Sequence, residues 1–122
     1  MKEEALTIVI PYLPKSLNTI IRMKRPQMCR YFGQCKHDAF FLTKEQRRQK
    51  IPYQKALMTI TFVVPDKRAR DRDNLIGGAK GMIDGIKKAG IFEDDSWQCL
   101  EMKFKVRIGK KAETIFEIEE IL

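Results

Sequence analysis

The feature that most constrains the fold is a strand-like segment followed by a helix-like segment and two further strand-like segments. Residues 57–65 (LMTITFVVP) are rich in β-branched side chains and predict a strand. Residues 74–90 show the apolar spacing of a helix, and Gly90 is placed to end it. Residues 97–109 and 113–121 alternate or run apolar, which predicts two strands joined by a hairpin loop. This order is typical of an α/β domain with a mixed sheet.

The chain before this unit is less regular. Residues 5–12 predict another strand, whereas residues 15–42 show no clear period and predict a long functional loop or an irregular, partly mobile region. Thr43 and Gln46 form a possible capping box, which predicts a short helix. A chain of 122 residues suits one domain. The expected fold is therefore α/β: a small single domain, residues 1–122, whose mixed β-sheet is covered by helices.

A helical projection of residues 74–90 separates an apolar face, which we expect to lie on the sheet. Its residues are Leu75, Ala79, Met82, Ile83 and Ile86. Glycine recurs at every fourth position, although each glycine costs about 1 kcal/mol relative to alanine inside a helix. These glycines are Gly77, Gly81 and Gly85. Two explanations stay open: close approach of another backbone, in a second helix, a nucleic-acid strand or a dimer contact, or a tight contact between this helix and the sheet.

The positive charge is concentrated in one segment. Between Lys15 and Lys50 the chain has ten Lys or Arg and two acids, Asp38 and Glu45, which accounts for the whole net charge of +8. A surface of this kind is expected to meet a polyanion such as nucleic acid. The alternative is that the charge serves solubility alone.

Composition also limits the class of protein. No apolar run reaches the roughly 18 residues that a membrane span needs, and the first residues are acidic before they are apolar, unlike a secretory signal. Three cysteines, Cys29, Cys35 and Cys99, are odd in number and too few for a disulfide framework, so we expect a reduced, cytoplasmic setting. A zinc site formed by Cys29, Cys35 and His37, with Asp38 or a dimer partner as the fourth ligand, is one hypothesis, and ordinary thiols are the other.

The stretch RARDRDNL sets two acids one residue apart, between a strand and a helix. In an extended segment, Asp71 and Asp73 point the same way. One interpretation is structural: Asp73 or Asn74 caps the helix, and Asp71 pairs with Arg70 or Arg72. The other is that the two carboxylates hold a cation.

A second acidic pair, Asp94 and Asp95, follows the helix. If the chain folds back so that Asp95 approaches Asp71 and Asp73, three carboxylates meet, and a divalent cation would relieve their repulsion. Such oxygen ligands favour Mg²⁺ or Mn²⁺, which can activate water and neutralise charge on a phosphate. In the same helical projection Lys80 lies on one face with Asp73, two turns further on, where it would touch the scissile phosphate or the leaving oxygen.

Together these residues resemble the motif region of the RusA family of Holliday junction resolvases. The match is dense over residues 66–97, thin over 8–18 and absent over 19–50. The acidic elements of the family, D-x-D-N and D-D-[SA], correspond to Asp71, Asp73 and Asn74 and to Asp94, Asp95 and Ser96.

Two further correspondences are partial. The family's P-P-S-x-N element is matched in part by Pro14, Ser16 and Asn18, with Lys15 as a departure. The family's helix lysine corresponds to Lys80 if three residues after Leu75 are an insertion.

The resemblance implies a homodimeric endodeoxyribonuclease that cuts four-way DNA junctions with Mg²⁺ and leaves 5′-phosphate and 3′-hydroxyl ends. It implies that Asp71, Asp73 and Asp95 bind the metal in each protomer and that Lys80 stabilises developing charge. Neither a small-molecule cofactor nor a membrane is expected. The side chains expected to contact DNA, mostly at phosphates, are Asn18, Arg22, Lys24, Arg25, Arg30, Arg47, Arg48, Arg68, Arg70, Arg72 and Asn74.

Two rival functions stay open. One is a module that binds branched or double-stranded DNA without cleaving it, in which the acids only cap and pair. The other is a nuclease of broader branched-DNA specificity.

Trp97 beside Asp95 is expected in the core, and stacking on an opened base is the alternative.

Overall fold

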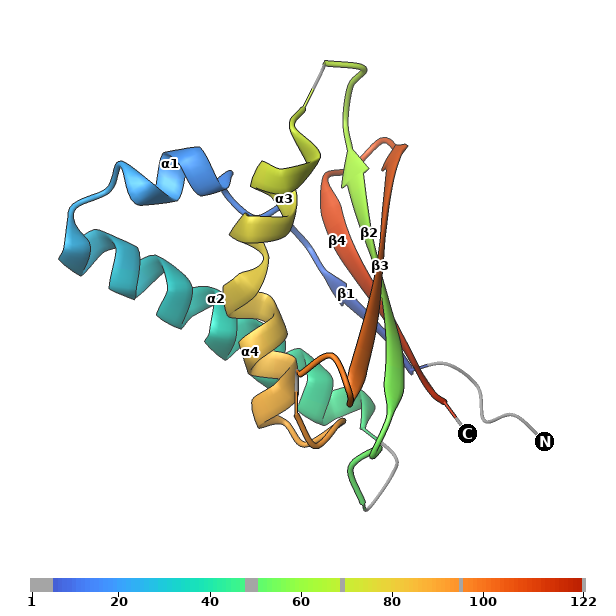
Figure 1. Ribbon diagram of the computed structural model, residues 1–122. Coiled ribbons are helices and arrows are strands. Elements are labelled where there is room, and N and C mark those ends of the chain that lie inside the picture. Colours follow the sequence, from blue (N-terminus) through green and yellow to red (C-terminus); the bar gives the residue numbers. More distant parts are fainter. Residues whose placement is uncertain (1–5, 48–50, 69, 95, 122) are drawn as a thin grey trace.

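One β-sheet organises the molecule, and helices cover one of its faces (Figure 1). The structure is a computed structural model, and it describes residues 6–47, 51–68, 70–94 and 96–121. Within these ranges there are four strands and four helices. The predicted fold class, α/β with a mixed sheet covered by helices, is confirmed.

The strand order in the sheet is β1-β4-β2-β3. Strand β2 pairs in parallel with β3 and antiparallel with β4, and β4 pairs antiparallel with β1. The strands are β1, Leu6–Ile10; β2, Ala56–Val64; β3, Leu100–Ile108; and β4, Glu113–Glu120. All four lie within or close to the predicted segments.

The predicted hairpin between the last two strands is wrong. Strand β2 lies between β3 and β4, so residues 109–112 cross the end of β2 and do not form a hairpin turn. The Gly109 amide donates to the carbonyl of Val64, the last residue of β2, over 2.9 Å. Strand β2 pairs with β3 on one side and with β4 on the other, whereas the hairpin would have paired β4 with the free side of β3.

The core lies between the sheet and the helices. Along β1, β4 and most of β2, alternate side chains point into it, as the period of a strand predicts, whereas β3 buries only Leu100. The largest strand side chains with almost no exposure are Ile8, Ile10, Met58, Ile60, Phe62, Phe116 and Ile118. They pack against the buried face of the helices.

The helices are α1, Leu17–Ile21; α2, Arg25–Gln46; α3, Arg72–Gly78; and α4, Lys80–Lys88. The helix expected at 74–90 is therefore two segments, divided at Ala79. Its predicted core face is buried throughout, from Leu75 to Ile86. Gly90 has a φ of 84°, which confirms it as the residue that ends the helix. No helix in the described part of the chain has the length and apolarity that crossing a membrane requires.

The loop expected at 15–42 is wrong, because this segment forms α1 and α2. The possible capping box is also wrong: the Thr43 hydroxyl donates to the Ala39 carbonyl inside α2 over 2.6 Å. The buried residues of α2 are Cys35, Ala39 and Thr43, four residues apart. A stripe of small side chains gives no strong apolar signal, so the sequence pattern was too weak to indicate a helix.

The recurring glycines of α3 and α4 face α1 and α2 of the same chain. A Cβ on Gly77 would lie 2.8 Å from Leu17 Cδ2, and one on Gly81 would lie 3.0 Å from the Phe32 carbonyl oxygen. A Cβ on Gly85 would overlap the carbonyl oxygen of Lys36 in α2. Close approach of a second helix is thus the correct explanation, and both the sheet contact and the dimer contact are wrong for these glycines.

Candidate functional site

Asp71 stands where the chain turns from the end of β2 into α3. Its backbone is extended, with φ −74° and ψ 120°, and its Oδ1 accepts a hydrogen bond from the Asp73 amide over 2.9 Å. Asp71 is therefore the N-cap of α3, a role that the sequence had suggested for Asp73 or Asn74. Asp73 lies in the first turn, and both acids are exposed.

The N-terminal motif lies directly against α3. The backbone amide of Asn18 donates to the side-chain oxygen Oδ1 of Asn74 over 3.2 Å, across 56 positions of sequence. A Cβ on Gly78 would overlap the Lys15 carbonyl oxygen, so this glycine allows the N-terminal segment to lie on the helix. Ser16 caps α1 by accepting from the Thr19 amide over 3.2 Å. The two segments that carry the family resemblance are thus side by side.

A groove of about 490 Å³ opens beside these two segments. Its lining residues come from both, from the loop after β2 and from the connection before β4: Leu13, Pro14, Ser16, Thr19, Pro65, Arg68, Arg70, Asp71, Asn74, Leu75 and Ala112. One carboxylate and two arginines therefore line the same groove, which suits an anionic chain together with a cation.

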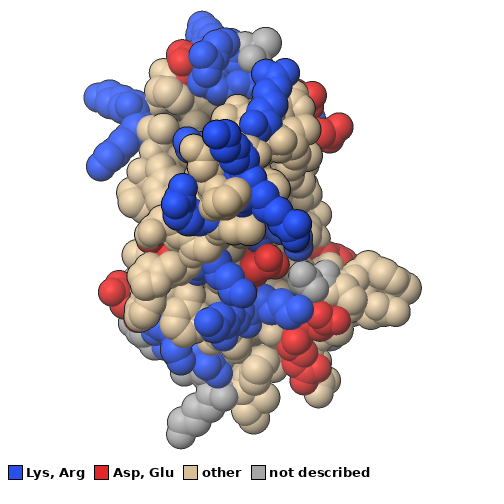
Figure 2. Space-filling view, turned by 90° about the vertical axis from the view of Figure 1, so that its left-hand side faces the viewer, with Lys and Arg blue, Asp and Glu red and all other residues tan. Residues whose placement is uncertain are grey.

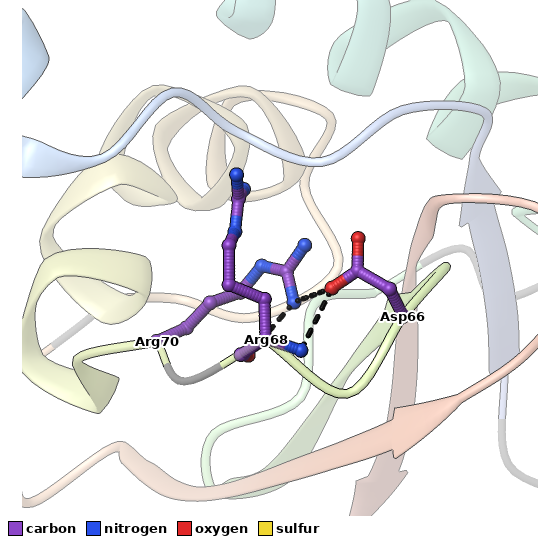
Figure 3. A network of polar contacts seen from close by, with 3 residues as sticks. All are labelled: Asp66, Arg68 and Arg70. Atoms are coloured by element: carbon purple, nitrogen blue, oxygen red, sulfur yellow. Dashed lines mark hydrogen bonds and ion pairs between the residues drawn. The ribbon is translucent and has the colours of Figure 1, made fainter.

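Arg70, one of the two arginines beside Asp71 in sequence, does not pair with it, which corrects that part of the structural interpretation. Arg70 Nη1 instead lies 3.0 Å from Asp66 Oδ1, and the Arg68 amide donates to the same oxygen over 2.9 Å (Figure 3). The hydrogen bond from Arg70, followed by that from Arg68, lowers the pKa of the Asp66 carboxyl below its ordinary value. Asp66 had no role in the sequence-based prediction, although an Asp placed directly after a strand-ending proline is a known turn signal.

Lys80 is exposed at the start of α4, and its Nζ lies 3.6 Å from Asp84 Oδ1. The projection that placed it on one face with Asp73 assumed a continuous helix, and the division at Ala79 separates the two residues. Its expected catalytic position stays a prediction.

The predicted convergence of three acids involves Asp95, which lies outside the described residues. Its neighbour Asp94 is bound to Lys87 Nζ at 3.0 Å, near the end of α4. Residues 91–93 bind Tyr53 through the Ile91 carbonyl and the Glu93 amide, just before β2 begins. Asp71 instead follows the other end of β2, a strand of nine residues or about 30 Å (Figure 1).

Among the residues that the structure describes, no three His, Cys, Asp or Glu side chains lie close enough to hold one metal ion. The three residues of the zinc hypothesis are among those that do not come together. Cys29, Cys35 and His37 all lie on α2, where steps of six and two residues turn about 240° and 200°. Cys29 is exposed, Cys35 is buried, and the His37 ring packs 4.6 Å from that of Phe41. One chain does not bring these three together.

The expected DNA-binding side chains divide into groups. Asn18, Arg22, Lys24, Arg25 and Arg30 are exposed on or beside α1 and the first turns of α2. Figure 2 shows that Lys and Arg spread over the helical face of the molecule. Arg68, Arg70 and Asn74 line the groove, and Arg72 is exposed at the start of α3.

Two residues of the expected DNA-binding set, Arg47 and Arg48, are not placed on this exposed surface by the structure. Arg47 is half-buried, and its Nη1 donates to the Ala89 carbonyl at the end of α4 over 3.1 Å, so it supports the fold there. Arg48 lies outside the described residues. Trp97 is 80% exposed, which shows that its expected place in the core is wrong and leaves stacking as the open alternative.

A smaller recess adds a residue that the sequence marked only as a departure from the family. It is lined by Lys15, Met23, Gln27, Arg30 and Tyr31. Lys15 Nζ lies 5.6 Å from the centre of the Tyr31 ring, and the Lys15 amide donates to the Tyr31 hydroxyl over 2.6 Å. Lys15 and Arg30 thus extend the basic surface beside the N-terminal motif.

Comparison with known proteins adds no assignment. No model of a known protein family matches the chain, and no curated protein matches its sequence.

Proposed function

We propose that this protein is a divalent-metal-dependent, structure-selective endodeoxyribonuclease that acts as a homodimer on four-way DNA junctions. The observation that best supports the proposal is the contact between Asn18 and Asn74, beside the groove that Asp71 lines. Two segments that resemble separate elements of one nuclease family meet there, although the sequence alone did not require them to meet.

The donor groups beside the groove are of the kind that Mg²⁺ uses. Asp71 Oδ1 accepts from Asp73, whereas Oδ2 accepts no hydrogen bond from any group that the structure describes. Mg²⁺ commonly binds through one or two carboxylates and keeps several waters, so we propose Asp71 and Asp73 as its protein ligands in the groove. When bound, such an ion would lower the pKa of a water and neutralise charge on a phosphodiester. Arg68 and Arg70 would orient the DNA backbone along the groove.

The resemblance also assigns Asp95 to the metal site of each protomer, and this assignment stays a prediction because Asp95 lies outside the described residues. Its described neighbour Asp94 lies near the opposite end of β2 from Asp71.

The central experiment incubates a synthetic four-way junction with the protein in Mg²⁺ or EDTA, beside linear duplex and fork controls. Asp71→Asn should reduce cleavage about 10³-fold while junction binding remains. The matched control is Glu117→Gln, a carboxylate exposed on the uncovered face of the sheet, which should cleave normally. Near-normal cleavage by Asp71→Asn would contradict the proposal.

A mixing experiment tests whether each protomer carries a complete site. Asp71→Asn and Asp95→Asn are each expected to be inactive, and their mixed dimers should stay inactive, because neither chain then has all three acids. Nicking that reappears after the two variants are unfolded together and refolded would show that the site spans two chains.

The non-catalytic rival has one observation in its favour: Asp71 caps α3, a role that explains its presence without a metal. Under that function, Mg²⁺ leaves a bound junction intact. The broader nuclease is recognised by equal cleavage of forks and junctions.

A further inference from the structure

Asp66 forms a small closed network with two arginines in the loop after β2 (Figure 3). One carboxylate oxygen, Oδ1, accepts both the Arg68 amide and Arg70 Nη1, over 2.9 and 3.0 Å. Arg70 Nη1 also donates to the Arg68 carbonyl over 3.1 Å. Arg70 is therefore attached at one nitrogen to both the side chain and the backbone of its own loop.

The arginine is the more enclosed member of this pair. Its side chain is 15% exposed, whereas that of Asp66 is 52% exposed. Arg70 also lines the groove, together with Asp71 and Asn74. The conformational freedom of a long arginine side chain is thus reduced in the free protein, before any DNA is bound.

The network leaves one edge of the guanidinium available. Both hydrogens of Nη1 are directed to Asp66 and Arg68, whereas Nε and Nη2 have no hydrogen-bond partner among the described residues. These two nitrogens form the edge that binds two phosphate oxygens in parallel. The same network keeps Arg70 from pairing with Asp71, its neighbour in sequence.

We propose that Asp66 is a positioning residue, which holds Arg70 so that its Nε and Nη2 bind a backbone phosphate of DNA in the groove beside Asp71. The inference rests on the proposed function only in requiring that DNA enters this groove. Asp66 itself touches neither DNA nor metal.

A purely structural role for Asp66 makes a different prediction. If Asp66 only shapes the loop through the Arg68 amide, its replacement should weaken DNA binding whether or not Arg70 is present. If it acts through Arg70, its replacement should matter only while Arg70 is there. A double-mutant cycle separates the two roles.

The experiment measures four-way junction binding in EDTA, at several salt concentrations, for wild type, Asp66→Asn, Arg70→Gln and the double variant. Asp66→Asn should weaken binding about fivefold, and Arg70→Gln about tenfold, with the slope of log K against log salt reduced by about one. In the double variant, Asp66→Asn should add less than about a twofold loss. Asp84→Asn, which removes the half-buried carboxylate that pairs with Lys80, is the matched control and should bind like wild type.

Cleavage kinetics give a second measurement. Asp66→Asn should raise KM and leave kcat within about twofold, because a positioned phosphate contact acts on binding. Asp66→Glu, which retains the charge, should recover part of the affinity. Unfolding curves for every variant ensure that the comparison is made between folded proteins.

The outcomes are distinct. Normal binding by Asp66→Asn, or losses that add fully in the double variant, would overturn the role of Asp66 and leave the nuclease proposal intact. Failure of the wild type to bind junctions would overturn both. Binding without cleavage in Mg²⁺ would overturn the nuclease proposal alone, since the double-mutant cycle needs no catalysis.

Discussion

Helices α2 and α4 touch one another but bury different kinds of surface. Helix α4 places Met82, Ile83 and Ile86 in the core beneath it, where large apolar side chains remove much area from water. Helix α2 buries Cys35, Ala39 and Thr43. Opposite these small residues stand Gly81 and Gly85 of α4, so the two backbones approach closely.

The difference shows that two helices of one core can be stabilised in different ways. Burial of large side chains tolerates small shifts of the backbone, whereas close backbone approach tolerates almost no added atom. Substitutions on the two sides of α4 should therefore fail for opposite reasons, one by a cavity and the other by overlap.

The largest expected effect is on the side of α4 that faces the core. Ile86→Ala should lower the free energy of unfolding by about 4 kcal/mol, because Ile86 is fully buried and its truncation leaves a cavity. Urea unfolding measures the change. A loss below about 1 kcal/mol would mean that α4 is not packed as the structure shows.

The next effect is on the side that faces α2. Gly85→Ala should lower the free energy of unfolding by about 3 kcal/mol, although alanine favours helices. The added Cβ would overlap the Lys36 carbonyl oxygen and lie 2.9 Å from the Ala39 Cβ. A gain in stability from Gly85→Ala would show that the two helices are farther apart in solution.

Gly33→Ala is the matched test within α2 itself. Gly33 is an exposed helical glycine, and nothing lies within 4 Å of a Cβ added to it. The substitution should raise the free energy of unfolding by up to about 1 kcal/mol, through helix propensity alone. A loss of stability would indicate a contact at this position that one chain does not contain.

The smallest expected effect on the free energy of unfolding concerns the polar side of α2, and it develops only at high pH. The Tyr12 hydroxyl donates to Asp38 Oδ2 over 2.6 Å, and burial raises the pKa of Tyr12 and of Tyr31 above the ordinary 10.0. The unfolded chain releases these protons first, so this contribution is complete below pH 10 and is lost as the pH rises above it. Tyr12→Phe should flatten the fall in unfolding free energy between about pH 9 and 11. An unchanged slope would contradict the assignment.

The same contrast explains which parts of the fold could be predicted. Strand β2 and the apolar face from Leu75 to Ile86 were predictable, because large apolar residues at strand and helix periods report burial directly. Helix α2 was not, since its buried stripe holds no large side chain. The recurring glycines did indicate close backbone approach, but not which backbone approaches.

The candidate site divides in a similar way. The position of Asp71 at a strand-to-helix junction was predictable, and so was a helix cap nearby, although Asp71 itself is the cap. The pairing of Arg70 with Asp66 was not, because the adjacent Asp71 offered an equally plausible partner in sequence. Only the course of the loop selects between the two carboxylates.

By itself, the sequence determined the chemistry available to this protein: the concentrated positive charge, the spacing of the acids and the segments able to form strands and the apolar helix. The tertiary structure decided which of these groups meet. It placed β2 between β3 and β4 and brought Asn18 into hydrogen-bonding contact with Asn74. It also placed Asp94 near the opposite end of β2 from Asp71. The physical reason is that side-chain patterns report local periodicity and burial, whereas contacts between distant segments depend on how whole elements pack together.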